Sequence, residues 1–176
     1  MRAHIGDDVP LMVDANQQWD RPTAQRMGRA MEEYHLDWIE EPLDAYEAKG
    51  HAALAASLDT PIATGEMLAS VAEHKELIRL GAADIIQPDA PRIGGITRFL
   101  ELAALAENEN LQLAPHFAME IHLHLAAAYP IEPWVDTSTG WSRCSTNAWR
   151  SATAACMSPP GRDSASLSVS RHGPVR

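Results

Sequence analysis

The stretch LDWIEEPLDAYEAKGHAALAASLDTPIATGE, residues 36–66, contains one complete strand–helix–strand unit. Leu36–Ile39 and Pro61–Ala63 are short apolar runs that predict buried strands, and residues 44–57 between them carry helical periodicity. Strands this apolar are typical of a parallel sheet covered by helices, because such strands are buried on both faces.

The same unit recurs on both sides of this stretch throughout the first 135 residues. Further strands are predicted at Val9–Val13, Asp84–Ile86 and Leu111–Ala114, and further helices at residues 22–34, 70–80, 96–109 and 119–128. Strictly alternating strands and helices predict an α/β fold with a parallel sheet. Both a barrel and an open doubly wound sheet satisfy this pattern.

An acid follows each of the first three strands, namely Asp14, Glu40 and Glu66, at intervals of 26 residues. One interval is one repeat of the unit, so the three carboxylates should emerge at the same end of neighbouring parallel strands, where barrel enzymes place their catalytic groups. Converging carboxylates repel each other and need a cation. Because neither cysteine nor paired histidine accompanies them, a hard divalent ion is expected, and Mg²⁺ fits best.

The next two strands are followed by Asp89 and His116. His116 is placed to act as an acid or a base on a substrate bound beside the metal. Asp89 emerges one strand away, where it can accept a hydrogen bond from the imidazole and fix its tautomer. His122 and His124 lie two residues apart on a predicted helix, so we expect them on different faces, as packing or surface residues.

Composition excludes several classes of function. The 176 residues carry a net charge of -10, which disfavours binding to nucleic acid or to an anionic membrane. No apolar run approaches the roughly 20 residues of a membrane span, and the first residues do not resemble a signal peptide. Two cysteines, Cys144 and Cys156, are too few for a disulfide framework. A cytoplasmic protein is therefore expected.

Residues 136–176 differ sharply from the rest of the chain. They hold nine of the eleven serines, both cysteines and only two acids, whereas residues 1–135 hold 22 acids and nine basic residues. No run in them has a period of 2 or 3.6 long enough to indicate a strand or helix. We predict a domain over residues 1–135 and an irregular segment over 136–176.

Five motifs resemble one family in order and spacing: LMVDANQQW, WIEEPLDAY, IATGEML, QPDAPRIGGIT and LAPHFAMEIHLHLAAAYPIEPW. The resemblance is to the enolase superfamily, mandelate racemase subgroup, and within it to dehydratases of acid sugars such as galactarate and L-talarate. It implies a partial (β/α) TIM-type barrel, the C-terminal domain of that superfamily. Because the family's capping domain and first barrel strands do not precede Met1, the resemblance implies a fragment.

The resemblance also implies roles for individual residues. A Mg²⁺-dependent hydro-lyase would remove the proton α to the carboxylate of an aldarate and eliminate water, and the family forms homo-oligomers. The implied Mg²⁺ ligands are Asp14, Glu40 and Glu66; the acid/base dyad is Asp89 with His116; Asn16 would lie near the substrate, and Asp136 stands where the family has an acid that helps to hold it.

One departure from the family bears on activity. The family places a Lys-x-Lys strand end on the other side of the substrate, but the only lysines here are Lys49 and Lys75, both in predicted helices. We therefore expect impaired turnover by the isolated chain. Two alternatives stay open: a racemase or epimerase of the same subgroup, and a non-catalytic remnant that binds metal.

The genetic code suggests an origin for residues 136–176. One choice of synonymous codons for DTSTGWSRCSTN, residues 136–147, encodes HFDWLEPLFN when it is read from its third base. That string is similar to the family's continuation after Pro-Trp-Val-Glu. The sequence thus predicts a reading-frame slip at Asp136, which resequencing of the gene would test.

Overall fold

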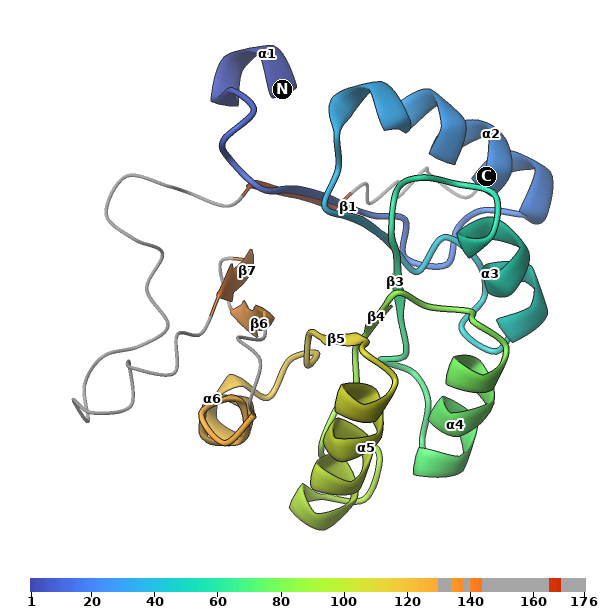
Figure 1. Ribbon diagram of the computed structural model, residues 1–176. Coiled ribbons are helices and arrows are strands. Elements are labelled where there is room, and N and C mark those ends of the chain that lie inside the picture. The colour runs from blue at the N-terminus through green and yellow to red at the C-terminus, as the bar shows by residue number, and fades with distance from the viewer. Residues whose placement is uncertain (130–133, 138–139, 144–164, 169–176) are drawn as a thin grey trace, which may run out of the picture.

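The computed structural model describes residues 1–129, 134–137, 140–143 and 165–168, and repeats one strand–helix unit along the chain (Figure 1). A short helix α1 (Arg2–Ile5) comes first. The units are β1 (Leu11–Asp14) and α2 (Arg21–Met31) with the 3-10 turn η1 (Glu32–Tyr34); β2 (Trp38–Glu40) and α3 (Ala48–Ala55); β3 (Ile62–Thr64) and α4 (Val71–Arg79); β4 (Ile85–Ile86) and α5 (Ile96–Asn108); and β5 (Gln112–Leu113) and α6 (Met119–Ala126). The five predicted strands and five predicted helices are confirmed, most of them a few residues shorter than predicted.

The strands form one parallel sheet in the order β5-β4-β3-β2-β1-β8, where β8 is Ala165–Ser168. Neighbouring strands in this sheet are consecutive in the chain from β1 to β5, as in a (β/α) barrel. Asp14 is paired with Glu40, and Glu40 with Ala63, so the carboxyl ends of β1, β2 and β3 lie at one edge. The predicted parallel α/β architecture is confirmed.

The two faces of the sheet bury different side chains. Helices α2 to α5 run along one face (Figure 1), and the apolar cluster on that side includes Leu11, Val13, Ile39 and Ile62. The side chains that alternate with them along the strands form a second cluster: Met12, Trp38, Ala63, Ile85, Ala114 and Trp134. Since successive side chains on a strand point to opposite faces, β1, β2 and β3 each contribute to both clusters.

Strands β6 (Trp134–Thr137) and β7 (Gly140–Arg143) form a separate antiparallel pair. The Trp134 ring packs edge-on against Trp38, with ring centroids 5.5 Å apart. The backbone N–H of Asp136 donates to the carbonyl oxygen of Pro115 at 3.4 Å. These contacts hold β6 beside the turn that follows β5, and so bring Asp136 to the carboxyl edge of the sheet.

The predicted irregular segment 136–176 falls largely outside the described residues, so that prediction and the boundary at residue 135 stay predictions. Within it the structure describes β7 and β8, neither of which the sequence pattern indicated. β8 pairs in parallel with β1, from Leu11 with Ala165 to Asp14 with Ser168. Pairing along an open sheet edge uses backbone groups, so it requires no periodic side-chain pattern.

Local sequence sets the helix ends. Asp20 caps the start of α2, and its carboxylate accepts a hydrogen bond from the backbone N–H of Thr23 at 2.9 Å. Gly81 follows α4 with a φ of 62°, a conformation that glycine adopts at little cost. Among the described residues, no helix combines the length and apolarity needed to cross a membrane.

Candidate functional site

Asp14 is the last residue of β1, Glu40 is the last residue of β2, and Glu66 lies in the turn after β3. Backbone hydrogen bonds join the ends of these strands: the N–H of Ala15 donates to the Glu40 oxygen, and the N–H of Glu41 donates to the Ala63 oxygen, both at 2.9 Å. The parallel register thus continues past the ends of the strands. It pairs Asp14 with Glu40 at the carboxyl ends of the strands, which we call the mouth, and Glu66 follows β3 at the same end, as the repeat spacing predicted.

The surroundings of Glu40 and Glu66 disfavour their charged forms. Burial, and then the charge of Asp14, raises the pKa of Glu40 to about 8, although a hydrogen bond from Trp38 acts in the opposite sense. Burial also raises the pKa of Glu66 to about 8, with further contributions from the negative charges of Glu41 and Asp14. Both shifts favour the neutral acid, so the ionised cluster is costly without a cation.

Each of the three carboxylates contacts a polar group within the chain. Asp14 accepts hydrogen bonds from the backbone N–H of Asn16 at 2.7 Å and from its side-chain amide at 3.3 Å. Glu40 Oε2 accepts from the indole N–H of Trp38 at 3.1 Å, and Glu66 Oε2 lies 3.5 Å from His116 Nε2. In the described part of the chain, no three Asp, Glu, His or Cys side chains are gathered closely enough to hold a metal ion as they stand.

The donor set nevertheless has the chemistry of a hard-cation site. It consists of carboxylate oxygens alone, which suit Mg²⁺ and Ca²⁺. Glu41, next to these acids, is buried, and its Oε1 has no hydrogen-bond partner. A divalent cation would offset the burial and the repulsion that raise the pKa values of Glu40 and Glu66, and it would compete with Asn16 and Trp38 for the carboxylates.

His116 follows β5 and lies between two acids of the mouth. Its Nδ1 is 3.4 Å from Asp89 Oδ2, and its Nε2 faces Glu66. The other oxygen of Asp89 accepts from the backbone N–H of Arg92 at 3.0 Å, which fixes the carboxylate plane. The 3.4 Å contact is longer than the about 2.7–2.9 Å of a charge-assisted hydrogen bond, as catalytic contacts often are before substrate binds.

The backbone beyond His116 is strained. Phe117 and Ala118 have φ values of 52° and 39°, in the left-handed region that side chains disfavour. Such residues cost on the order of 1 kcal/mol each, and surrounding contacts must hold them. One such contact is the hydrogen bond from the Phe117 N–H to Asp136 Oδ2 at 3.1 Å. Asp136 therefore lies at the mouth, and its charge also raises the pKa of Glu66.

Sequence reasoning did not find two residues that donate to acids at the mouth, Gln17 and Trp38. Gln17 donates from its side-chain amide to Glu41 Oε2 at 2.6 Å, while burial raises the pKa of Glu41 to about 7. Trp38 holds Glu40. The Trp38 contact had a signal in the sequence, because residues two apart on a strand share a face. No periodicity signals the Gln17 contact, which depends on how two loops meet.

The two lysines lie away from the mouth. Lys49 is exposed in α3, and Lys75 in α4 forms an ion pair with Glu101 of α5 at 3.1 Å. His124 is exposed on α6 and His122 is buried, so the prediction that both are packing or surface residues is confirmed.

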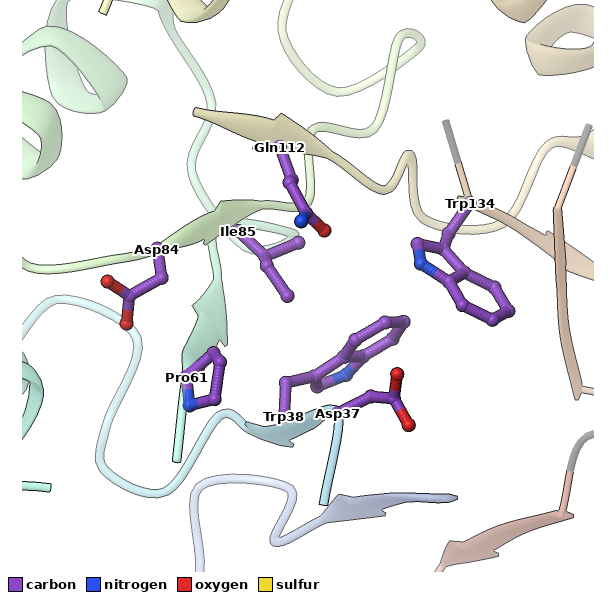
Figure 2. A pocket seen from close by; sticks show the side chains of 7 residues that line it. All are labelled: Asp37, Trp38, Pro61, Asp84, Ile85, Gln112 and Trp134. Carbon is purple, nitrogen blue, oxygen red and sulfur yellow. The ribbon is translucent and has the colours of Figure 1, made fainter. Parts of the chain in front are cut away.

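A cavity of about 120 Å³ opens at the amino ends of the strands, opposite the mouth. Figure 2 shows Trp38, Ile85 and Gln112 directed into it. It is lined by Asp37, Trp38, Pro61, Asp84, Ile85, Gln112 and Trp134. It contains none of the predicted site residues, and in such folds the chemistry occurs at the other end of the strands.

Comparisons with known proteins agree with this geometry. The family described as enolase C-terminal domain-like matches residues 1–158. The L-talarate/galactarate dehydratase of Salmonella typhimurium is 65% identical over 136 residues, which are 77% of this chain and 34% of that protein. The chain thus spans about a third of the length of this curated relative.

Solved structures show the same likeness. The L-talarate dehydratase of Polaromonas, in complex with Mg and L-glucarate, is 72% identical with a TM-score of 0.74, over 76% of this chain and 37% of that one. A racemase from Streptomyces coelicolor with bound magnesium is 35% identical with a TM-score of 0.76, over 79% of this chain and 42% of that one.

Proposed function

This chain belongs to the enolase C-terminal domain-like family, and we propose that it carries the metal ligands and the acid/base dyad of a Mg²⁺-dependent acid-sugar dehydratase. One observation carries the proposal: Asp14 is paired with Glu40 at the carboxyl ends of β1 and β2, Glu66 follows β3 close enough to feel the charge of Asp14, and His116 reaches Glu66 from the end of β5. The metal-ligand and dyad assignments are part of the proposal.

The substrate class is an aldarate, a sugar with a carboxylate at each end. Relatives whose names state their activity act on L-talarate, galactarate and related sugar acids, and we extend that class to this chain. Asn16, held beside Asp14, and Asp136, held beside Phe117, are the proposed substrate contacts.

The reaction requires removal of a weakly acidic proton α to a carboxylate. When bound, Mg²⁺ would supply electrostatic stabilisation of the negative charge that develops on that carboxylate. Asp14, Glu40 and Glu66 would hold the ion. His116 Nε2, the ring nitrogen that faces the mouth, takes the α-proton, while Asp89 holds the hydrogen on Nδ1. The resulting imidazolium can then protonate the departing β-hydroxyl, so that water leaves.

The proposal is tested by incubating the chain with galactarate or L-talarate and MgCl₂ and by following products with NMR. We expect a 2-keto-3-deoxy aldarate that disappears with chelator and in His116→Asn. His124→Asn is the matched control, because His124 is exposed on the neighbouring helix. Turnover that survives in His116→Asn or in chelator would contradict the assignment.

The same experiment separates the alternatives. An epimerised aldarate without loss of water would identify a racemase or epimerase, a possibility supported by the likeness to the Streptomyces coelicolor racemase. Mg²⁺ binding without turnover would identify a metal-binding remnant. A family-type homo-oligomer and a cytoplasmic location stay predictions from the sequence.

A further inference from the structure

His122 of α6 has no part in the proposed reaction, yet it touches both turns that carry the dyad. The side chain is fully buried. Its Nε2 lies 3.0 Å from the backbone nitrogen of Ala90, and its Nδ1 lies 2.6 Å from the carbonyl oxygen of Phe117.

These two contacts determine the protonation state of the ring. The Ala90 N–H is only a donor, so Nε2 must accept and carries no hydrogen. The Phe117 carbonyl is only an acceptor, so Nδ1 must carry the hydrogen. His122 is therefore the neutral Nδ1–H tautomer, and burial, which lowers its pKa, supports the same form.

The two contacts of His122 are made to the residues that directly follow the two members of the dyad. Ala90 is the residue after Asp89, and Phe117 is the residue after His116. On the other side of the dyad, the His116 N–H donates to the carbonyl oxygen of Pro88 at 3.1 Å. The turn of Asp89 and the turn of His116 are thus joined twice, once directly between their backbones and once through the His122 ring.

We propose that His122 is a positioning residue that sets the distance between Asp89 and His116. The ring is a rigid spacer between two backbone groups, so its removal would let the turns separate and would loosen the contact of His116 Nδ1 with Asp89 Oδ2. This role rests on the proposed function only in that the dyad performs catalysis; the bridge itself is independent of it.

Two conservative variants each keep half of the bridge. His122→Gln places an acceptor near the position of Nε2, and His122→Asn places a donor near that of Nδ1. His122→Phe keeps the ring volume and loses both hydrogen bonds. His124→Phe, two residues away on the exposed face of α6, is the matched control.

The primary measurement is NMR on the whole chain without substrate. We expect ¹⁵N shifts of His122 typical of the Nδ1–H tautomer. In His122→Phe we expect the Ala90 amide to exchange at least tenfold faster and the His116 ring ¹⁵N shifts to move, while the Ile86 amide in β4 stays unchanged. His122→Gln should restore the protection of Ala90, and the control should resemble wild type.

Two results would overturn the proposal. One is an Nε2–H tautomer of His122 in wild type, which is readable even if a variant fails to fold. The other is unchanged Ala90 exchange and unchanged His116 shifts in a folded His122→Phe. If the chain turns over aldarates, kcat in His122→Phe should fall about tenfold with little change in KM, and an unchanged kcat would also contradict the role. A chain without turnover would refute the proposed function but leave the NMR test of the bridge intact.

Discussion

Acids stand at both ends of the same strands, and their surroundings differ. At the amino ends, Asp37 Oδ2 accepts from the backbone N–H of Leu11, and Asp84 Oδ2 accepts from that of Ile62, both at 2.9 Å. At the carboxyl ends, Glu40 is buried and Glu66 is half-buried, both near other carboxylates, and their pKa values are raised to about 8.

The difference separates structural acids from functional ones. Asp37 and Asp84 each accept a hydrogen bond from the first N–H of a neighbouring strand, which would otherwise lack a partner. Their charged carboxylates therefore stabilise the sheet. Glu40 comes only three residues after Asp37, yet its charge opposes folding until a cation arrives. A buried charge without a counter-charge destabilises a folded protein. A cluster of such charges therefore indicates a binding site.

The largest expected effect concerns catalysis at the mouth. We expect the chain to turn over galactarate at least about 100-fold more slowly than the Salmonella typhimurium relative, because neither lysine of this chain lies at the mouth and loss of one acid or base costs about 10²–10⁴-fold. Parallel kcat measurements on the two proteins check this. A kcat within tenfold of the relative would show that His116 and Asp89 suffice.

The second largest effect should be on Mg²⁺ affinity, which should depend on the acids at the carboxyl ends of the strands and not on those at the amino ends. Glu40→Gln keeps an acceptor for the Trp38 indole but removes a charge from the mouth, and it should weaken Mg²⁺ binding at least about tenfold. Asp84→Asn removes a charge from the amino ends and should leave the affinity unchanged. Titration calorimetry on the three proteins checks both statements, and equal affinities of wild type and Glu40→Gln would refute the ligand assignment.

The stability of the metal-free protein should depend on pH because of the carboxyl groups at the mouth. Because the folded pKa of Glu40 is about 8, above its ordinary value of 4.5, the folded state binds more protons between these values. The free energy of unfolding should therefore fall as pH rises from about 5 to 8, on the order of 2 kcal/mol. Saturating Mg²⁺ should flatten the slope.

Denaturant titrations at several pH values check this expectation, with Glu40→Gln as the control whose slope should be shallower. A metal-free protein whose stability stays level or rises across this range would show that the mouth is better solvated than its burial indicates.

More of the fold than of the site could be predicted from the sequence. The strands and helices could be predicted because apolar runs and helical periodicity are local signals, and one repeat length then placed Asp14, Glu40 and Glu66 at one edge. The burial that raises the pKa values could not be predicted, since it depends on how the turns pack. The roles of the site residues stay predictions.

Contacts between distant turns were the part that sequence could not supply. His122 was expected only to pack or to lie on the surface, because nothing in its spacing from Ala90 indicates a hydrogen bond. The strained turn at Phe117 and Ala118 was likewise missed, as neither residue type favours a positive φ. The pairing of β8 with β1 uses backbone groups and leaves no side-chain pattern to read.

The smallest expected effect belongs to the amino ends. Asp84→Ala removes the acceptor for the Ile62 N–H at the start of β3. Because Asp84 is exposed, water can replace part of this bond, and we expect a loss of about 1 kcal/mol in the free energy of unfolding with no change in Mg²⁺ affinity. At pH 8 without metal, Glu40→Gln should change stability in the opposite direction, since it removes a buried charge. Denaturant unfolding of both variants at pH 8 measures the two signs side by side. If both variants lose stability, the division between structural acids at one end and cation-dependent acids at the other is wrong.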